Sequence, residues 1–343
     1  MVLKELCALR GVSGNEHEVR DFLLEKVRKT ADEVRVDRMG NVLAVKKADR
    51  ADAPTILLDA HMDEVGMIVV GVNDNGLLSY DTVGGIDSRV VVSKRVRVGE
   101  KAVPGVIGAK AIHLQTAAER ETVLGHSDLY IDIGAKDRAQ AEEMVKPGDY
   151  VSFDSDYVEF GDGYVKARAL DDRVGCMTLL RILENRYDVN VVCAFTCQEE
   201  IGLYGALAAR FGVECDAAVV MEGTSANDMG CVEDHQKVCS LKKGVAVSFM
   251  DNSALHDRQL FARMLEIGRE EGIPCQVKNR VAGGNDAGPI RSSREAVATV
   301  VLSVPCRNIH SPSSVAAFED MDAQYALTDA FLRQAANCPT HRS

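Results

Sequence analysis

Acidic residues and histidines stand at or just beyond the ends of several predicted strands of this chain. Open α/β sheets bind their ligands at the carboxyl ends of the strands, so we expect these side chains to converge. Two histidines with carboxylates, and without cysteine, form a nitrogen and oxygen ligand set that suits zinc, cobalt or manganese. The segments are His61-Met62-Asp63, Asp171-Asp172, Glu199-Glu200, Glu222 and His310.

Taken singly, these segments also fit structural roles. Residues i and i+2 of a strand face one side, so Asp63 is placed to accept the second ring hydrogen of His61, although a lone strand-end histidine more often serves structure. Asp171-Asp172 opens a predicted helix, where an acid favours the helix dipole, yet a carboxylate can also bridge two cations. Glu199-Glu200 ends an apolar strand, where extended backbone points the two acids in opposite directions; a solvated loop would also satisfy them.

Together the segments indicate more than each does alone. Two histidines, one bridging aspartate and two glutamates make two three-ligand sites with a shared ligand, which leaves Glu199 as a general base. A two-metal hydrolase needs cations roughly 3.5–4 Å apart, an activated water between them and a carboxylate that moves its proton. The set therefore predicts hydrolytic chemistry with two divalent metal ions.

Helices and strands alternate in the part of the chain that would position the first of these residues. Apolar residues recur at helical spacing and predict a helix near 15–29, preceded by Ser13 and Glu16 at the spacing of a capping box. Valine-rich runs at 34–36 and 42–45, separated by a glycine turn, predict two strands. A third, apolar strand then leads into His61-Met62-Asp63.

The pattern of apolar residues changes twice along the chain, near residues 67 and 162. Between 67 and 162, short valine-rich runs broken by Gly, Asn and Asp predict a β-rich module. Beyond 162, helical patterns alternate with apolar strands, as before 67, which predicts an α/β sheet with helices on its faces. We therefore expect one discontinuous catalytic domain, 1–66 and 163–343, with a β-rich insertion at 67–162.

Composition excludes several classes of protein. The chain has 343 residues, and 40 Lys and Arg against 52 Asp and Glu give a net charge of −12, which argues against a nucleic-acid partner. The longest apolar runs fall short of the roughly 18 residues that a membrane span requires. Glu5 interrupts the first residues, so we expect no secretory signal and a cytoplasmic protein. The ten cysteines lack a CxxC pair and are expected to be free thiols.

Several motifs follow one another in order over nearly the whole chain. They resemble those of the M42 family of metallo-aminopeptidases, which includes glutamyl aminopeptidases and TET-like enzymes and whose members are sometimes labelled cellulase or endoglucanase. The motifs are His61-Met62-Asp63-Glu64-Val65-Gly66, Ala169-Leu170-Asp171-Asp172-Arg173, Gln198-Glu199-Glu200-Ile201-Gly202, Gly283-Gly284-Asn285-Asp286-Ala287 and Pro305-Cys306-Arg307-Asn308-Ile309-His310-Ser311-Pro312, with Gly105-Val106-Ile107-Gly108, His113-Leu114-Gln115 and Tyr130-Ile131-Asp132-Ile133-Gly134-Ala135 in the insertion.

The resemblance implies roles for the candidate residues. One metal, zinc with cobalt or manganese as alternatives, would be held by one triad and a second metal by another, with a bridging aspartate common to both. Glu199 would be the general base, Asp63 the partner of His61, and the Asp171-Asp172 peptide would be cis. The triads are His61, Asp171 and Glu222 for the first metal and Asp171, Glu200 and His310 for the second.

The resemblance also implies an architecture and a reaction. The fold would be a mixed sheet flanked by helices, of the zinc-peptidase-like phosphorylase/hydrolase type, with a PDZ-like insert that mediates the assembly of dimers into a homo-dodecamer. The enzyme would remove N-terminal residues from short peptides through a water that bridges two metals and is activated by Glu199. His113 or Gln115 would reach a neighbouring subunit's pocket, or else serve as structural turn residues.

Some positions depart from the family's commoner pattern. Glu222 stands where many members have Asp, Lys242-Lys243-Gly244-Val245 replaces a Gly-Lys-Gly-Pro stretch, and Asn285 replaces Thr, so specificity cannot be copied from a relative.

Two other functions are alternatives to an aminopeptidase. A glycoside hydrolase would also use paired carboxylates, but the matched histidines have no place in its mechanism. A non-catalytic binding protein would not need every ligand position and the base filled.

Overall fold

The continuous apolar runs of the sequence form the centre of one large sheet. In the computed structural model, which describes residues 2–336, four parallel strands adjoin one another and are almost wholly buried, as in a sheet covered on both faces. These strands are β3 (Thr55–His61), β12 (Asn190–Thr196), β13 (Ala217–Ser225) and β16 (Ala298–Cys306). With β1 (Glu33–Val36), β2 (Val42–Lys46), β14 (Val245–Ser248) and β15 (Cys275–Val277), they give the order β1-β2-β12-β3-β13-β16-β14-β15.

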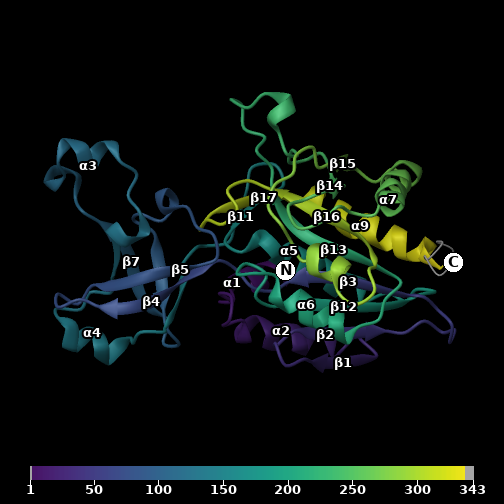
Figure 1. Cartoon of the computed structure of the whole chain (residues 1–343), viewed down its shortest axis with the longest axis horizontal. Coiled ribbons are helices and arrows are strands. Elements are labelled where there is room, and N and C mark those ends of the chain that lie inside the picture. Colours follow the sequence, from purple (N-terminus) through teal and green to yellow (C-terminus); the bar gives the residue numbers. More distant parts are fainter. Residues whose placement is uncertain (1, 337–343) are drawn as a thin grey trace.

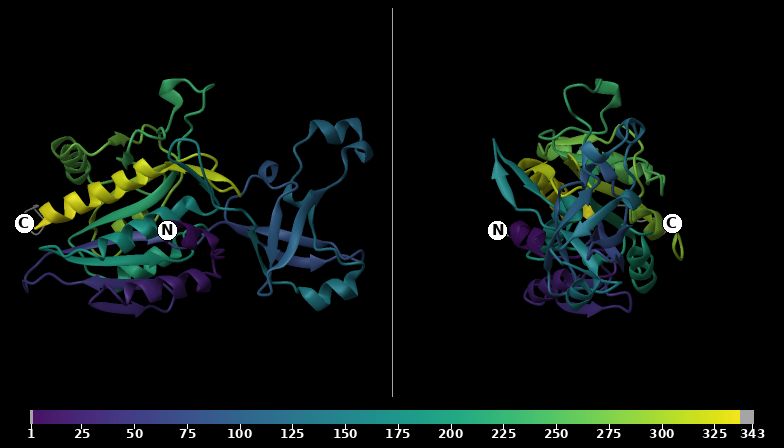
Figure 2. Two further views of the ribbon diagram at one scale, coloured as in Figure 1. Left: turned by 180° about the vertical axis from the view of Figure 1, so that it is seen from behind. Right: turned by 90° about the vertical axis from the view of Figure 1, so that its left-hand side faces the viewer.

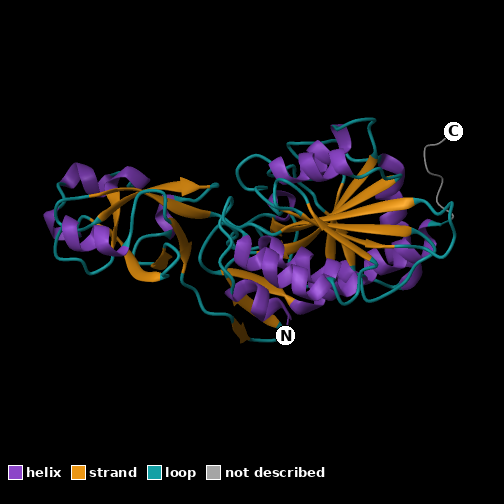
Figure 3. Cartoon of the chain, turned by 90° about the horizontal axis from the view of Figure 1, so that it is seen from below, coloured by secondary structure: helices purple, strands orange, loops and turns teal. Residues whose placement is uncertain are grey.

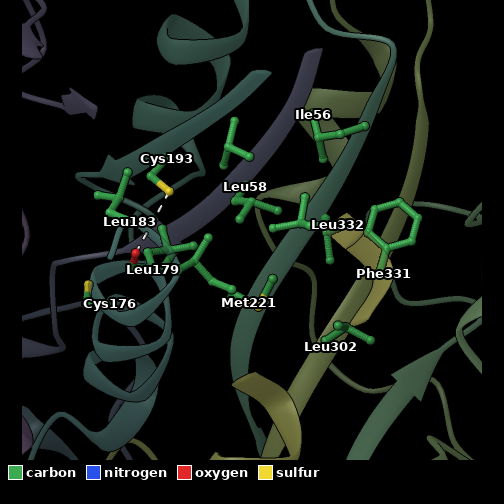
Figure 4. Packing of buried hydrophobic residues seen from close by; sticks show 14 of the residues in the cluster. Ile56, Leu58, Cys176, Leu179, Leu183, Cys193, Met221, Leu302, Phe331 and Leu332 are labelled. Atoms are coloured by element: carbon green, nitrogen blue, oxygen red, sulfur yellow. Dashed lines mark hydrogen bonds between the residues drawn. The ribbon is translucent and has the colours of Figure 1, made fainter. Parts of the chain in front are cut away.

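Helices cover both faces of this sheet (Figure 3). Alternate residues of a strand face opposite sides, so Ile56 and Leu58 of β3 join one core cluster and Leu57 joins the other. The first cluster, shown in Figure 4, is completed by α2 (His17–Val27), α5 (Leu170–Ile182), α7 (Arg258–Glu271) and α9 (Phe318–Ala335). The second is completed by α6 (Tyr204–Gly212) and α8 (Ala287–Ser292), while α1 (Val2–Ala8) lies over α5.

A closed barrel interrupts the chain after β3 and forms a separate lobe (Figures 1 and 2). Its strands follow the order β4-β5-β8-β7-β6-β9 around a core of their own that includes Met67, Ile107 and Ile131. The barrel elements are β4 (Gly66–Val72), β5 (Leu78–Val83), β6 (Arg95–Val98), β7 (Val103–Ala109), β8 (Leu129–Asp132), β9 (Tyr150–Phe153), α3 (Ala117–Glu121) and α4 (Arg138–Met144), with 3-10 turns η1 (Ser88–Val90), η2 (Ile112–Leu114) and η3 (His126–Asp128).

The chain returns to the large lobe through a small sheet. β10 (Val158–Phe160), β11 (Tyr164–Ala167) and β17 (Ser314–Ala317) pair antiparallel next to the start of α5. A fourth 3-10 turn, η4 (Asp234–Gln236), lies in the long loop after β13. The predicted α/β sheet with flanking helices is confirmed, and so is a small β-rich lobe.

The start of α2 differs from the sequence prediction. The helix near 15–29 is present as α2, but the capping box is wrong: the hydroxyl of Ser13 donates to Asp63 Oδ2. The Oε1 atom of Glu16 instead accepts hydrogen bonds from the backbone N–H groups of Gly14 (2.7 Å) and Gln198 (3.2 Å). Long-range contacts to the loops around Asp63 and Gln198 therefore replace a local cap.

Two further expectations concern membranes and thiols. Among the described helices, no segment has the length and apolar character to cross a bilayer. The cysteines within residues 2–336 are unpaired thiols, most of them buried, as expected from their spacing; Cys338 lies outside the described residues.

Asp251 fastens two loops of the large lobe to each other. Its Oδ1 atom accepts hydrogen bonds from the backbone of Ser253 (2.6 Å) and Ala254 (2.9 Å), and its Oδ2 atom accepts one from Asn285 Nδ2 (2.9 Å). The Nε2 atom of buried His256 lies 2.9 Å from the same Oδ2. Burial alone would raise the pKa of Asp251, but the nearby His256 ring and the hydrogen bonds from Ser253 outweigh it and lower this pKa to about 2.

Replacing Leu58 should measure the contribution of the central strand. Leu58 is fully buried, and Leu58→Ala leaves a cavity between β3 and the helices, so we expect the free energy of unfolding to fall by about 2–5 kcal/mol. Urea unfolding of the metal-free protein followed by far-UV circular dichroism measures this, since the chain has no Trp. Val36→Ala, at a residue 45% exposed, should stay within about 0.5 kcal/mol; an equal loss there would contradict the packing account.

The lowered pKa of Asp251 predicts a pH-dependent stability. Because its pKa is about 2 in the folded chain and about 3.9 when unfolded, its contribution of about 2 kcal/mol is present above pH 4 and is lost as the pH falls towards 2. Asp251→Asn should therefore destabilise the protein at pH 7 and have a smaller effect at pH 3. The exposed Asp52→Asn is the control, and a gap that stays constant between the two pH values would refute the assignment.

Candidate active site

The predicted site residues meet at the carboxyl edge of the large sheet. His61 is the last residue of β3, and Asp63 lies two residues beyond it. Glu222 lies within β13. The remaining residues come from the turn after β12 (Glu199 and Glu200), the start of α5 (Asp171) and the loop between β16 and β17 (His310). Chain segments far apart in the sequence thus supply one cluster.

Two groups of possible metal ligands share Asp171. In the first group, His61 Nε2 lies 3.5 Å from Asp171 Oδ1 and 3.8 Å from Glu222 Oε2. In the second, His310 Nε2 lies 3.8 Å from Asp171 Oδ2 and 3.2 Å from Glu200 Oε2. Within each group the potential ligand atoms lie within 4.8 Å of one another. Asp171 turns one oxygen towards each group, as a bridging carboxylate requires.

The second ring nitrogen of each histidine faces an oxygen acceptor, and in His310 it is hydrogen-bonded. His310 Nδ1 lies 2.9 Å from the carbonyl oxygen of Gly85, and a carbonyl only accepts, so Nδ1 carries the hydrogen. His61 Nδ1 lies 3.5 Å from Asp63 Oδ1, the partner predicted for it. In both rings Nε2 therefore faces the acids, and it is the nitrogen available to a metal ion once the ring is neutral.

The site concentrates carboxylates in a buried region. Burial raises the pKa values of Glu199, Glu200 and Glu222 well above their ordinary range, and neighbouring carboxylates add to this while His61 opposes it. Burial would lower the pKa of His61, but the adjacent carboxylates of Asp171 and Asp63 hold it well above its ordinary value.

Divalent cations fit this donor set. The buried Oε1 of Glu222 has no hydrogen-bond partner among the described residues, so a polar atom at the centre of the cluster is left unsatisfied. Cations would neutralise the crowded acids and supply the missing partner, and imidazole with carboxylate suits zinc, cobalt or manganese.

The turn after β12 differs from the extended backbone that the sequence predicted. The strand ends at Thr196, and Gln198 has a left-handed conformation (φ 56°). Asp63 holds the turn by accepting the backbone N–H groups of Glu199 (3.0 Å) and Glu200 (3.2 Å). The two acids do not point in opposite directions, because both group with His61 within 4.8 Å.

The start of α5 is built around Asp171 and Asp172. The peptide between them is cis, as the resemblance implied, and both residues have non-helical dihedral angles. Asp171 Oδ1 accepts the backbone N–H of Gly223 (3.1 Å), and Asp172 Oδ1 accepts that of Gly175 (3.0 Å). Asp172 is thus the acid that satisfies the helix start, and Asp171 is the one turned to the histidines.

Residues behind the site were missed by sequence reasoning. Glu64, buried beside Asp63, forms an ion pair with Arg168 and accepts the backbone N–H of Gly11 (3.0 Å). Buried Asp286 accepts the hydroxyl of Thr196 (2.7 Å), and burial raises its pKa to about 6. Glu64 and Asp286 belong to segments already singled out, but nothing in their spacing indicated buried partners.

The positions expected to contact substrate have structural partners here. Asn285 is buried, and its side chain bonds to Asp251. Lys242 Nζ lies 2.8 Å from Asp162 Oδ2, in an exposed ion pair. In the barrel, His113 is exposed in η2, and Gln115 Nε2 donates to the carbonyl of Lys110 (2.7 Å), so a reach into a neighbouring subunit stays a prediction.

Known proteins share this sequence and fold over nearly their full length. The chain is 31% identical to the lysyl aminopeptidase of Pyrococcus furiosus, over 97% of this chain and 96% of that protein. The TET aminopeptidase of the marine sediment archaeon Thaumarchaeota archaeon SCGC AB-539-E09 superposes with a TM-score of 0.94 at 32% identity, covering 97% and 95%. The TET1 peptidase of Pyrococcus horikoshii, which can assemble into a tetrahedron or a large octahedral shell, gives 0.85 at 31%, covering 96% and 98%.

The family itself is identified by a profile match. The profile described as M42 glutamyl aminopeptidase matches residues 40–327, which is most of the chain and includes every residue of the two ligand groups. The chain therefore belongs to the M42 family of aminopeptidases.

Proposed function

We propose that the chain is a metal-dependent aminopeptidase that removes N-terminal residues from short peptides with the help of two divalent cations. The observation that carries this proposal is the pair of ligand groups joined by Asp171, with one further carboxylate, Glu199, beside them. A mononuclear site would need only one such group. Two groups that share a carboxylate match the requirement of a two-metal hydrolase.

The metal ligands follow from the two groups. His61, Asp171 and Glu222 would hold one cation, and Asp171, Glu200 and His310 the other; the ions are zinc, with cobalt or manganese as alternatives. When bound, the cations would polarise the scissile carbonyl and lower the pKa of the attacking water.

Glu199 is the residue that we propose as the general base. Its carboxylate groups with His61 and Glu200 but belongs to neither triad, so it stays free to accept a proton from the attacking water and pass it to the leaving amine. Asp63 positions this base, since it accepts the backbone N–H groups of both Glu199 and Glu200. The free amino terminus of the peptide would lie near the carboxylates of the triads, which favour a cation.

We also propose that the two lobes have different functions. Residues 1–66 and 163–343 would form the catalytic domain, and residues 67–162 a PDZ-like insert through which dimers assemble into a dodecamer. Two observations support this: the barrel has a core of its own, and the Pyrococcus horikoshii relative can assemble into a tetrahedron or a large octahedral shell. The expected cytoplasmic location rests on the sequence alone.

Glu199→Gln should separate metal binding from catalysis. The amide keeps the shape of the side chain but cannot accept a proton from water, so we expect kcat on aminoacyl p-nitroanilides to fall by about 10²–10⁴-fold while two metal equivalents remain bound. Steady-state kinetics with metal analysis of the same samples measures both. Glu184→Gln, at an exposed residue, is the control; a Glu199→Gln enzyme with near-normal kcat would refute the general-base assignment.

Metal removal should abolish peptide cleavage, and it also distinguishes an aminopeptidase from the alternative glycoside hydrolase. Chelation leaves the buried acids without their counter-ions, so we expect loss of p-nitroanilide hydrolysis and its return with zinc, cobalt or manganese added singly. A parallel assay on a cellulose substrate covers the glycoside hydrolase alternative. Polysaccharide cleavage that survives chelation, without any peptide hydrolysis, would overturn the proposed function.

A further inference from the structure

The barrel sends a short segment, residues 84–87, between β5 and η1 to the candidate metal site. The carbonyl of Gly85 accepts a hydrogen bond from His310 Nδ1 (2.9 Å). Gly84 has a φ of +84°, and a Cβ there would lie 2.8 Å from Val65 Cγ1 and 3.4 Å from Glu200 Cβ. The segment thus lies against His310 and Glu200, the two unshared ligands of one group, while the positive φ and the close approach to Val65 favour glycine at position 84.

The same segment is fixed to the barrel on its other side. His126 of η3 lies with its Nε2 atom 2.9 Å from the carbonyl oxygen of Ile86. The hydroxyl of Ser88 donates to the carbonyl of Leu124 (2.6 Å). Both Ile86 and Leu124 pack against the core of the barrel. A chain of direct contacts therefore joins the barrel core to His310.

The orientation of His126 is determined by its two partners. Because the Ile86 carbonyl only accepts, Nε2 carries the hydrogen, and Nδ1 of the neutral ring is then an acceptor. Tyr80 supplies the matching donor, with its hydroxyl 3.1 Å from Nδ1 and its ring edge-on to the imidazole. Burial raises the pKa of Tyr80 to about 12, so its hydroxyl keeps the proton that it donates.

We propose that the barrel completes the second candidate metal site: the Gly85 carbonyl fixes the metal-binding tautomer of His310, and His126 is a positioning residue that holds this carbonyl in place. The inference rests on the proposed function, because it takes His310 as a ligand. It assigns the insert a part in the metal centre of its own subunit, separate from any part in assembly. The triad His61, Asp171 and Glu222 has no contact with residues 84–87 among the bonds described above, so the effect should fall on one metal only.

The expected magnitude follows from the way in which hydrogen-bonded partners tune metal ligands. Loss of a partner that orients a ligating histidine lowers metal affinity by about 10–100-fold. His126 acts through one intervening peptide, so we expect His126→Phe to weaken one zinc equivalent by about tenfold and leave the other within twofold. His126→Gln places an amide N–H near the position of Nε2 and should restore affinity to within about threefold.

Zinc titration of the metal-free full-length protein against a chromophoric chelator tests the proposal without any substrate. His17→Phe, the same substitution at an exposed histidine of the large lobe, is the matched control, and circular dichroism verifies that each variant is folded. A double-mutant cycle with His310→Ala locates the effect: His126→Phe should cause no further loss once His310 is absent.

Each outcome decides one point. Equal weakening of both equivalents, no weakening by His126→Phe, or a loss that persists in the His310→Ala background would overturn the role of the barrel and leave the proposed function intact. A parent protein that binds fewer than two zinc ions would overturn the metal assignment and this inference with it. If two ions bind as expected but no peptide is cleaved, the aminopeptidase proposal fails and the positioning role stands.

Discussion

The structure depends on one electrostatic constraint: several carboxylates are buried together at the carboxyl edge of a parallel sheet. Removing an ionised carboxylate from water is costly unless it is paired, and here Asp171 lies close to Glu222 in one ligand group and to Glu200 in the other. The raised pKa values of Glu199, Glu200 and Glu222 express that cost. Two divalent cations, held as we propose, would offset that cost, because the donor atoms form two groups that share Asp171.

Much of the surrounding structure serves to hold these acids in place. Asp63 fixes the turn that carries Glu199 and Glu200, and Ser13 in turn donates to Asp63. Behind it, Glu64 is paired with Arg168, whose guanidinium also donates to the carbonyls of Ala8 and Leu9 at the end of α1. The N-terminal helices thus contact residues that position the candidate site, although they supply none of its candidate ligands.

The sequence predicted the parts of this arrangement that depend on local pattern. Apolar runs indicated the buried strands, and the positions of acids and histidines after those runs indicated a common site, which the sheet topology brings about. It could not predict the partner of Ser13, because the spacing to Glu16 fitted a local cap while the bond to Asp63 spans fifty residues of chain.

Other features were out of reach for a related reason. The opposed directions expected for Glu199 and Glu200 assumed extended backbone, whereas Gln198 is left-handed and the strand ends at Thr196. The contact of Gly85 with His310 joins residues of two lobes more than two hundred positions apart. Every residue has a backbone carbonyl, so the residue type at position 85 could not indicate this contact. Roles that depend on backbone groups or on distant pairs require coordinates.

We expect two cations to bind, one on either side of Asp171. A crystal structure of the zinc-loaded protein with anomalous data at the zinc edge measures this directly. We expect two peaks roughly 3.5–4 Å apart, one next to His61 and Glu222 and the other next to Glu200 and His310, with Asp171 between them. A single peak, or peaks on other residues, would contradict it.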